Sequence, residues 1–179
     1  MEHNNEIRID SPFDKEKIKE LRAGDRVLLT GTVYTARDQA HKRLTEALAA
    51  GKTLPFELEN AAVYYVGPSP APEGRCIGSA GPTTSYRMDP YAPVMMDHGQ
   101  TIMIGKGPRN DEVKAAMKRN GAVYLAAIGG CGALMSKCIV ASELIAYEDL
   151  GAEAVRKLTV KNMPLIVVTD RFGNDLYEK

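Results

Sequence analysis

Short apolar runs alternate along the chain with stretches in which apolar residues recur at helical spacing. The first pattern is typical of buried strands and the second of amphipathic helices, so the sequence predicts an α/β fold with a mixed sheet. The expected strands are residues 27–33, 61–66, 76–80, 101–104, 122–127, 140–147 and 165–169, with a hairpin turn at residues 172–175.

Capping residues mark the expected helices. Asp14 can cap a short helical turn, and Asn110 or Asp111 can cap a helix that runs through Arg119. Gly51 ends a longer amphipathic pattern, because glycine readily adopts the left-handed backbone that follows a helix. The expected short turn spans residues 15–21, and the longest helix spans residues 36–50.

The chain has 179 residues, which is enough for one domain with a full core and too few to expect two. Residues 1–12 are a polar lead-in, and residues 13–179 form the expected single domain. The sequence contains no internal repeat, low-complexity tract or interdomain linker.

Charge and composition exclude several kinds of protein. Lys plus Arg and Asp plus Glu number 23 each, so the formal net charge is zero, whereas nucleic-acid binding favours a basic excess or stripe. The polar N-terminus lacks the apolar segment of a signal peptide, and no apolar run is long enough to span a bilayer. We therefore expect a cytoplasmic protein that binds neither nucleic acid nor membrane.

The three cysteines, Cys76, Cys131 and Cys138, include no Cys-x-x-Cys pair. A disulfide framework is therefore not expected, and a reducing compartment is favoured. Three thiolates are the number that an open iron–sulfur site needs, but Cys131 and Cys138 flank apolar residues and Cys76 lies far away along the chain. Buried cysteines that act as small hydrophobic residues are the expected state. No His, Cys or carboxylate set has zinc-site spacing, so no metal ligand is expected in this chain.

The first candidate site lies where a glycine-containing strand leads into the helix of residues 36–50. Arg37 and Asp38 fall at the start of that helix, and His41 follows Arg37 by one helical turn on the same face. Free backbone N–H groups and the helix dipole favour an anion at such a helix start. An exposed, charged first turn is the alternative interpretation.

A second candidate site lies in residues 78–89. Two glycines let the backbone approach a ligand closely, and hydroxyl residues that include Thr83 and Thr84 supply directional hydrogen bonds. Arg87 adds a planar guanidinium that can hold a carboxylate through two bonds. The alternative is a solvated loop with a turn at Gly81 and Pro82.

A third candidate site is Lys106, which stands between Gly105 and Gly107 at the end of an expected strand. A lysine in this position can contact an anion, although Gly-Lys-Gly is also common in plain turns. It is not a P-loop, because the Gly-x-x-x-x-Gly-Lys-Ser/Thr spacing is missing.

Three elements occur in this order along the chain: Ala-Arg-Asp-Gln-Ala-His at residues 36–41, Gly-Pro-Thr-Thr-x-x-Arg-Met-Asp at 81–89, and Gly-Lys-Gly at 105–107. Together they resemble the β-type part of class I fumarases and L-tartrate dehydratases, over almost the whole chain from about residue 13 to 178. The Gly-Pro-Thr-Thr-x-x-Arg-Met element is highly specific, whereas Gly-Lys-Gly is specific only in the company of the others. Family members often have a small residue where Tyr86 stands.

The resemblance implies a swivelling β/β/α domain, similar to the mobile domain of aconitases. It also implies an α-type hydro-lyase subunit or domain whose cysteines hold a [4Fe–4S] cluster, with no cluster bound by this chain alone. A small dicarboxylate substrate would lie between the two parts. In isolation, the face that meets the α-type partner can pair with its own copy in a homodimer.

The resemblance also implies the roles of the candidate residues. Thr83 and Lys106 would act in catalysis, and substrate would be bound by Arg37, Arg87, Lys106 and Thr84. Asp38 and His41 would orient the arginines. A threonine hydroxyl alone is a poor base, so Thr83 would need a neighbouring carboxylate from Asp38 or from the partner.

The expected function is the reversible hydration of fumarate to malate. Within the enzyme class, the alternative is L-tartrate dehydration, which removes water by the same chemistry. Outside it, the alternative is a non-catalytic swivelling domain that binds a partner or a small anion.

Overall fold

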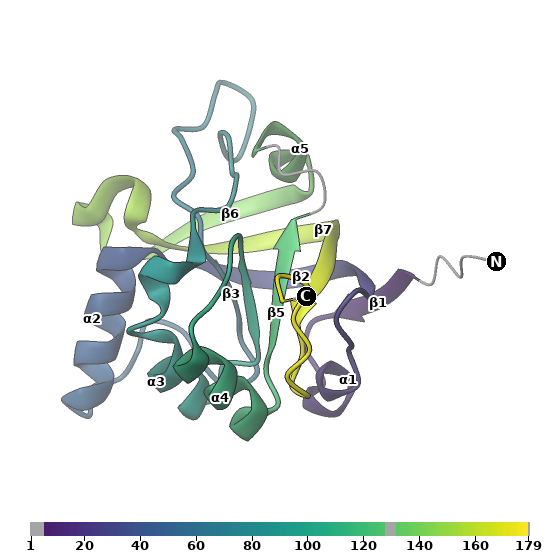
Figure 1. Cartoon of the computed structure of the whole chain (residues 1–179). Coiled ribbons are helices and arrows are strands. Elements are labelled where there is room, and N and C mark those ends of the chain that lie inside the picture. The colour runs from purple at the N-terminus through teal and green to yellow at the C-terminus, as the bar shows by residue number, and fades with distance from the viewer. Residues whose placement is uncertain (1–5, 128–131, 179) are drawn as a thin grey trace.

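A mixed sheet of seven strands is the framework of the computed structural model, which describes residues 6–127 and 132–178 (Figure 1). The strands are β1 (Glu6–Asp10), β2 (Arg26–Thr35), β3 (Ala62–Tyr64), β4 (Ile102–Gly105), β5 (Val123–Ala127), β6 (Ile139–Ala146) and β7 (Val155–Thr169). They pair in the order β1-β2-β3-β4-β5-β7-β6, and β2 also pairs with β7. This additional pairing closes β2, β3, β4, β5 and β7 into a barrel-like ring. The α/β class and the mixed sheet are confirmed.

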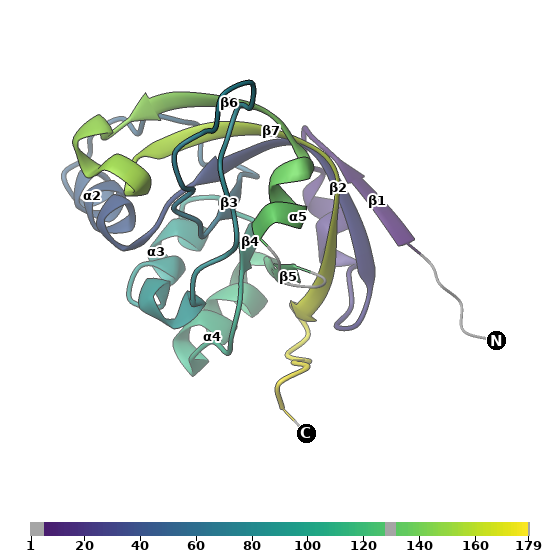
Figure 2. The ribbon, with the colours of Figure 1, turned by 90° about the horizontal axis from the view of Figure 1, so that it is seen from above.

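The long strand β7 closes the ring because it pairs antiparallel with both β2 and β5. Strands β2 to β5 run parallel to one another. Strand β1 extends the sheet beside β2, and β6 extends it beside the first half of β7. Figure 2 shows β6 and β7 arching together over one end of the ring.

Helices pack against the sheet in two apolar layers. Val63 belongs to the outer layer and its neighbour Tyr64 to the inner one, because successive residues of a strand point to opposite faces. The outer layer lies under α2, α3 and α4, whereas residues of α1 and α5 join the layer inside the ring (Figure 1). The helices are α1 (Lys15–Lys19), α2 (Asp38–Ala49), α3 (Ala92–Asp97), α4 (Asp111–Asn120) and α5 (Gly132–Lys137), with 3-10 segments η1 (Ser85–Met88) and η2 (Glu148–Glu153). In the described ranges, no helix has the length and apolar character needed to cross a membrane.

The predicted caps of two helices are confirmed. The Asp14 carboxylate accepts a hydrogen bond from the backbone N–H of Glu16, and the Asn110 side chain accepts one from Val113. Gly121 follows α4 in the left-handed conformation, with a φ of +69°. These side chains and this glycine satisfy backbone groups that a helix end leaves without partners.

Several predicted elements differ from the structure. Residues 76–80 form no strand, because their backbone bonds join a loop and the start of α5: the N–H of Ser69 donates to Ser79 O at 3.0 Å, and that of Ala80 to Gly132 O at 3.2 Å. The polar lead-in contains β1, and α3 and α5 were not predicted. Strand β7 begins at Val155, ten residues before the predicted strand of residues 165–169. Its first part was not predicted, because lysines and Pro164 interrupt the apolar pattern.

A buried ion pair joins the end of η1 to the start of α4. Arg109 Nε donates to Asp89 Oδ1 at 2.7 Å, and the backbone N–H of Asn110 donates to Asp89 Oδ2 at 3.0 Å. The two side chains are 0% and 6% exposed. The Arg109 guanidinium also reaches the Tyr65 hydroxyl at 3.3 Å. Three separate segments are thus fixed to one another inside the outer apolar layer.

We expect Arg109→Met to lower the free energy of unfolding by about 3–5 kcal/mol, because it leaves the Asp89 carboxylate buried without a cation. Urea unfolding measures this loss. Arg119→Met is the matched control, since Arg119 and Asp97 form a pair at 2.9 Å with side chains 54% and 43% exposed. Exposed pairs contribute below about 1 kcal/mol, so equal losses in the two variants would contradict the assignment of the buried pair.

Candidate carboxylate-binding site

The three candidate segments follow the carboxyl ends of neighbouring parallel strands. Strand β2 ends at Thr35, β3 at Tyr64 and β4 at Gly105, and these strands are adjacent in that order. The carboxyl ends of parallel strands lie at one edge of a sheet, where α/β proteins commonly bind ligands. The topology therefore gathers segments that are far apart in the sequence.

Arg37, Asp38 and Arg87 form the first group of site side chains. Arg37 is the N-cap residue of α2, and its Nε lies 3.9 Å from Asp38 Oδ1. The other oxygen of Asp38, Oδ2, lies 3.8 Å from Arg87 Nη1. Both distances exceed those of charge-assisted hydrogen bonds, so Asp38 pairs loosely with two guanidinium groups.

Glu153, at the end of η2, brings a second carboxylate to this helix start. Its Oε1 accepts a hydrogen bond from the backbone N–H of Gln39 at 3.3 Å and lies 4.0 Å from Arg37 Nε. A carboxylate from the chain itself thus occupies the position where the sequence predicted an anion. Sequence reasoning missed Glu153, because it lies 114 residues from Gln39 in a segment without a recognisable motif.

Thr83, Thr84 and Lys106 form the second group, which backbone contacts hold together. Thr84 and Lys106 pair as an isolated parallel bridge, and the N–H of Ser85 donates to Lys106 O at 2.8 Å. The N–H of Thr83 donates to Tyr65 O, just beyond β3, at 2.7 Å. Lys106 is exposed, whereas Thr83 and Thr84 are half-buried.

The two groups belong to one continuous set of contacts. Asp38 lies beside Arg37 and Arg87, Arg87 belongs to the 3-10 helix that starts directly after Thr84, and Thr84 bridges to Lys106. Three cations and two threonines are thereby brought to one edge of the sheet. This combination suits a ligand with more than one carboxylate.

His41 lies beneath this edge and is 0% exposed. Its Nδ1 is 2.9 Å from Arg37 O, so a neutral ring with a proton on Nδ1 donates to that carbonyl. Burial lowers the pKa of His41 to about 4, and the nearby Arg109 acts in the same direction, against smaller raising effects of the Arg37 carbonyl and Asp38. His41 therefore holds the backbone of Arg37, not its guanidinium.

The cysteines differ from the expected buried state. Cys76 is exposed and Cys138 is partly buried, while Cys131 lies outside the described residues. Cys76 is also near Cys138 in space, because its Sγ donates to Ile139 O at 3.4 Å. Within residues 6–127 and 132–178, no set of three His, Cys, Asp or Glu side chains is arranged to hold a metal ion.

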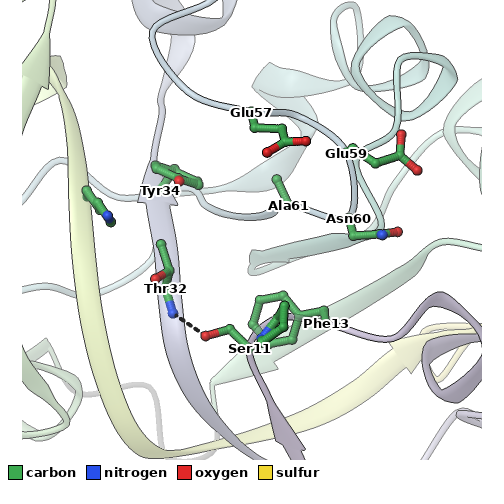
Figure 3. Close-up of a pocket in the computed structure, with 10 residues that line it drawn as sticks. Ser11, Phe13, Thr32, Tyr34, Glu57, Glu59, Asn60 and Ala61 are labelled. Carbon is green, nitrogen blue, oxygen red and sulfur yellow. Dashed lines mark hydrogen bonds between the residues drawn. The ribbon is translucent and has the colours of Figure 1, made fainter.

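A cavity of about 480 Å³ lies apart from the predicted site, between β2 and the segment before β3. Figure 3 shows Thr32 and Tyr34 on one side of it, Glu57 and Glu59 on another, and Ser11 at a third. Its carboxylates are opposed by a single lysine, Lys157, among the residues that line it. Repulsion between like charges disfavours a dicarboxylate in this cavity.

Comparison with known proteins identifies the family. Residues 1–179 match the family described as fumarase C-terminus, and the chain belongs to this family. Fumarate hydratase 2 of Leishmania major is 39% identical over 177 residues, which are 97% of this chain and 31% of that protein. The anaerobic class I fumarate hydratase of Escherichia coli K12 is 40% identical over 156 residues, 86% of this chain and 28% of that protein.

A relative of similar length has a different name. The putative L(+)-tartrate dehydratase subunit beta of Methanocaldococcus jannaschii is 37% identical over 171 residues, which are 92% of this chain and 88% of that protein. The chain thus spans less than one-third of the two fumarate hydratases but nearly all of this subunit. The resemblance to class I fumarases and tartrate dehydratases is confirmed.

The buried state of His41 predicts a stability that falls in acid. The unfolded chain binds a proton at His41 near pH 6.5, whereas the folded chain binds it only near pH 4. Between these values the unfolded state takes up more protons, so acid favours it, by about 3 kcal/mol in total. Urea unfolding from pH 7 to pH 4 should show this slope in the wild type and a smaller one in His41→Phe. The same slope in both proteins would show that His41 is not the group responsible.

Proposed function

We propose that this chain is the β-type part of an iron–sulfur hydro-lyase, and that it supplies carboxylate-binding residues for the reversible hydration of fumarate to malate. The observation that carries the proposal is the convergence of Arg37, Arg87 and Lys106 at the carboxyl edge of the parallel strands. The Glu153 carboxylate supports it, because it binds the start of α2 in the manner expected of a substrate carboxylate.

The three cations act on the two substrate carboxylates. Each arginine can hold a carboxylate through two parallel hydrogen bonds, and Lys106 adds a compact positive charge. Loss of the Cα proton places extra negative charge on the adjacent carboxylate, so the cations bind the transition state more strongly than the substrate. The loose ion pairs of Arg37 and Arg87 with Asp38, at 3.8–3.9 Å, yield to a substrate that approaches more closely.

Thr83 is the group that moves the Cα proton in this proposal. A threonine hydroxyl needs a neighbouring carboxylate to act as a base. Asp38 is already engaged by Arg37 and Arg87, so a carboxylate of the partner is the stronger candidate. Thr84 binds substrate beside Thr83. Asp38 orients the side chains of Arg37 and Arg87, and His41 holds the backbone carbonyl of Arg37.

The cluster belongs to an α-type partner in this proposal. The described part of the chain offers no ligand set for a metal. When bound, the partner's [4Fe–4S] cluster supplies a Lewis acid for the substrate hydroxyl and carboxylate. The edge that carries Arg87 is accessible to a partner, since Tyr86 is 60% exposed beside it. The same proposal includes a swivelling motion that opens and closes this edge. It also includes pairing of the isolated chain with its own copy.

L-tartrate dehydration is the second candidate function. The observation that favours it is the match to nearly the whole putative tartrate dehydratase subunit beta of M. jannaschii. The same carboxylate contacts serve both substrates, so the residues of this chain do not separate them. Separate assays with fumarate, L-malate and L-tartrate distinguish the two functions.

Arg87→Lys tests the proposal in the enzyme assembled anaerobically with its α-type partner. Lysine keeps the charge but loses the planar fork, and a hydrogen bond to a charged group contributes about 1.5–3 kcal/mol. We therefore expect kcat/KM for the better substrate to fall by roughly ten- to more than a hundredfold, partly through kcat.

Arg119→Lys, on the exposed face of α4, is the control and should keep wild-type kinetics. Assembly and cluster content should be unchanged in both variants. Near-wild-type kinetics for Arg87→Lys in a complex with its full cluster would refute the site, and turnover by the α-type partner alone would refute the proposed division of roles.

A further inference from the structure

A series of hydrogen-bonded hydroxyl groups connects the backbone N–H of Lys106 to the backbone C=O of Gly107. The backbone N–H of Lys106 donates to Ser85 Oγ at 3.0 Å. The Tyr124 hydroxyl lies 2.9 Å from Ser85 Oγ and 2.8 Å from Gly107 O. The contacts therefore start and end on neighbouring residues of the Gly-Lys-Gly segment, and they pass through side chains from η1 and β5.

The number of available protons fixes which hydroxyl donates and which accepts in this hydrogen-bonded series. A carbonyl oxygen can only accept, and a tyrosine hydroxyl has one proton, so Tyr124 donates to Gly107 O. Ser85 then donates its own proton to Tyr124 and accepts the Lys106 N–H. Every donor among these hydroxyl and N–H groups is used once, and a hydrogen-bond network is stronger when all of its members have partners.

The surroundings leave this arrangement little freedom. Ser85 and Tyr124 are both 0% exposed. A side chain at Gly105 would collide with Ser85 Oγ, so glycine there lets the serine approach the strand end. The Arg109 guanidinium packs over the Tyr124 ring at 4.9 Å from its centre. Burial raises the pKa of Tyr124, which keeps its hydroxyl proton in place.

The backbone N–H of Gly107 also has a hydrogen-bond partner. Its N–H donates to the hydroxyl of Tyr177 in the C-terminal tail at 3.1 Å. Two tyrosines thus bind the N–H and the C=O of one glycine, whose φ of +84° suits a residue without a side chain. The backbone of Lys106 is fixed at its base, although the residue itself is exposed.

We propose that Ser85 and Tyr124 are positioning residues of the candidate site, which fix the backbone of Lys106 and Gly107 and thereby direct the Lys106 side chain toward a substrate carboxylate. This inference rests on the proposed function for its catalytic consequence, but its structural part stands on the isolated chain. A lysine has a flexible stem, so a fixed backbone limits the volume that its ammonium group explores.

Amide hydrogen exchange, followed by NMR on the isolated chain, tests the structural part. Tyr124→Phe removes one hydroxyl and keeps the ring, so exchange of the Lys106 N–H should accelerate by about three- to tenfold. Tyr147→Phe, a half-buried tyrosine beside Arg43, is the matched control and should leave that rate unchanged. Unchanged exchange in Tyr124→Phe would overturn the inference.

Kinetics of the assembled enzyme test the catalytic part through a double-mutant cycle with Lys106→Met. We expect Tyr124→Phe to lower kcat/KM about tenfold when Lys106 is present and by less than about twofold when it is replaced. An equal loss in both backgrounds would show a general structural defect and overturn the positioning role. If Lys106→Met alone leaves kcat/KM unchanged, the proposed site fails, and the exchange rates still decide whether the hydroxyl chain holds the peptide.

Discussion

The buried ion pair of Asp89 and Arg109 is the contact on which the arrangement of the site depends. Its carboxylate fixes the end of η1, and its guanidinium reaches Tyr65 after β3 and packs over Tyr124 of β5. A buried charge is costly without its partner, so these segments cannot separate independently. The turn that carries Arg87 is therefore anchored from within the core while its side chain remains 47% exposed.

The site combines this rigid base with loosely paired charges at its surface. Parallel strands β2, β3 and β4 bring three distant segments to one edge, and backbone contacts hold Thr83, Thr84 and Lys106 there. By contrast, the ion pairs of Arg37 and Arg87 are 3.8–4.0 Å long and partly exposed, so they cost little to replace. A fixed scaffold with exchangeable counterions is suited to binding an anion that enters from outside the chain.

Sequence patterns predicted the elements whose signals are local. Helix α4 has the predicted cap at Asn110, and β3 and β4 are continuous apolar runs because both of their faces are buried. The sequence also pointed to Arg37, Arg87 and Lys106. It did not reveal Glu153 or Tyr124 as parts of the same site, or the contact of Ser85 with Lys106, because these contacts join residues far apart in the chain. Residues 76–80 were wrongly predicted to form a strand for the same reason, since their short apolar run lies in a loop.

Hydrogen exchange by mass spectrometry on the assembled enzyme, with and without L-malate, tests the location of the site most directly. We expect L-malate to slow exchange in the peptides that contain Thr83–Arg87 and Lys106–Gly107. We expect unchanged exchange at residues 57–61, of which Glu57, Glu59, Asn60 and Ala61 line the cavity of about 480 Å³. Slower exchange confined to residues 57–61 would contradict the proposed location of the site and would place the ligand in that cavity.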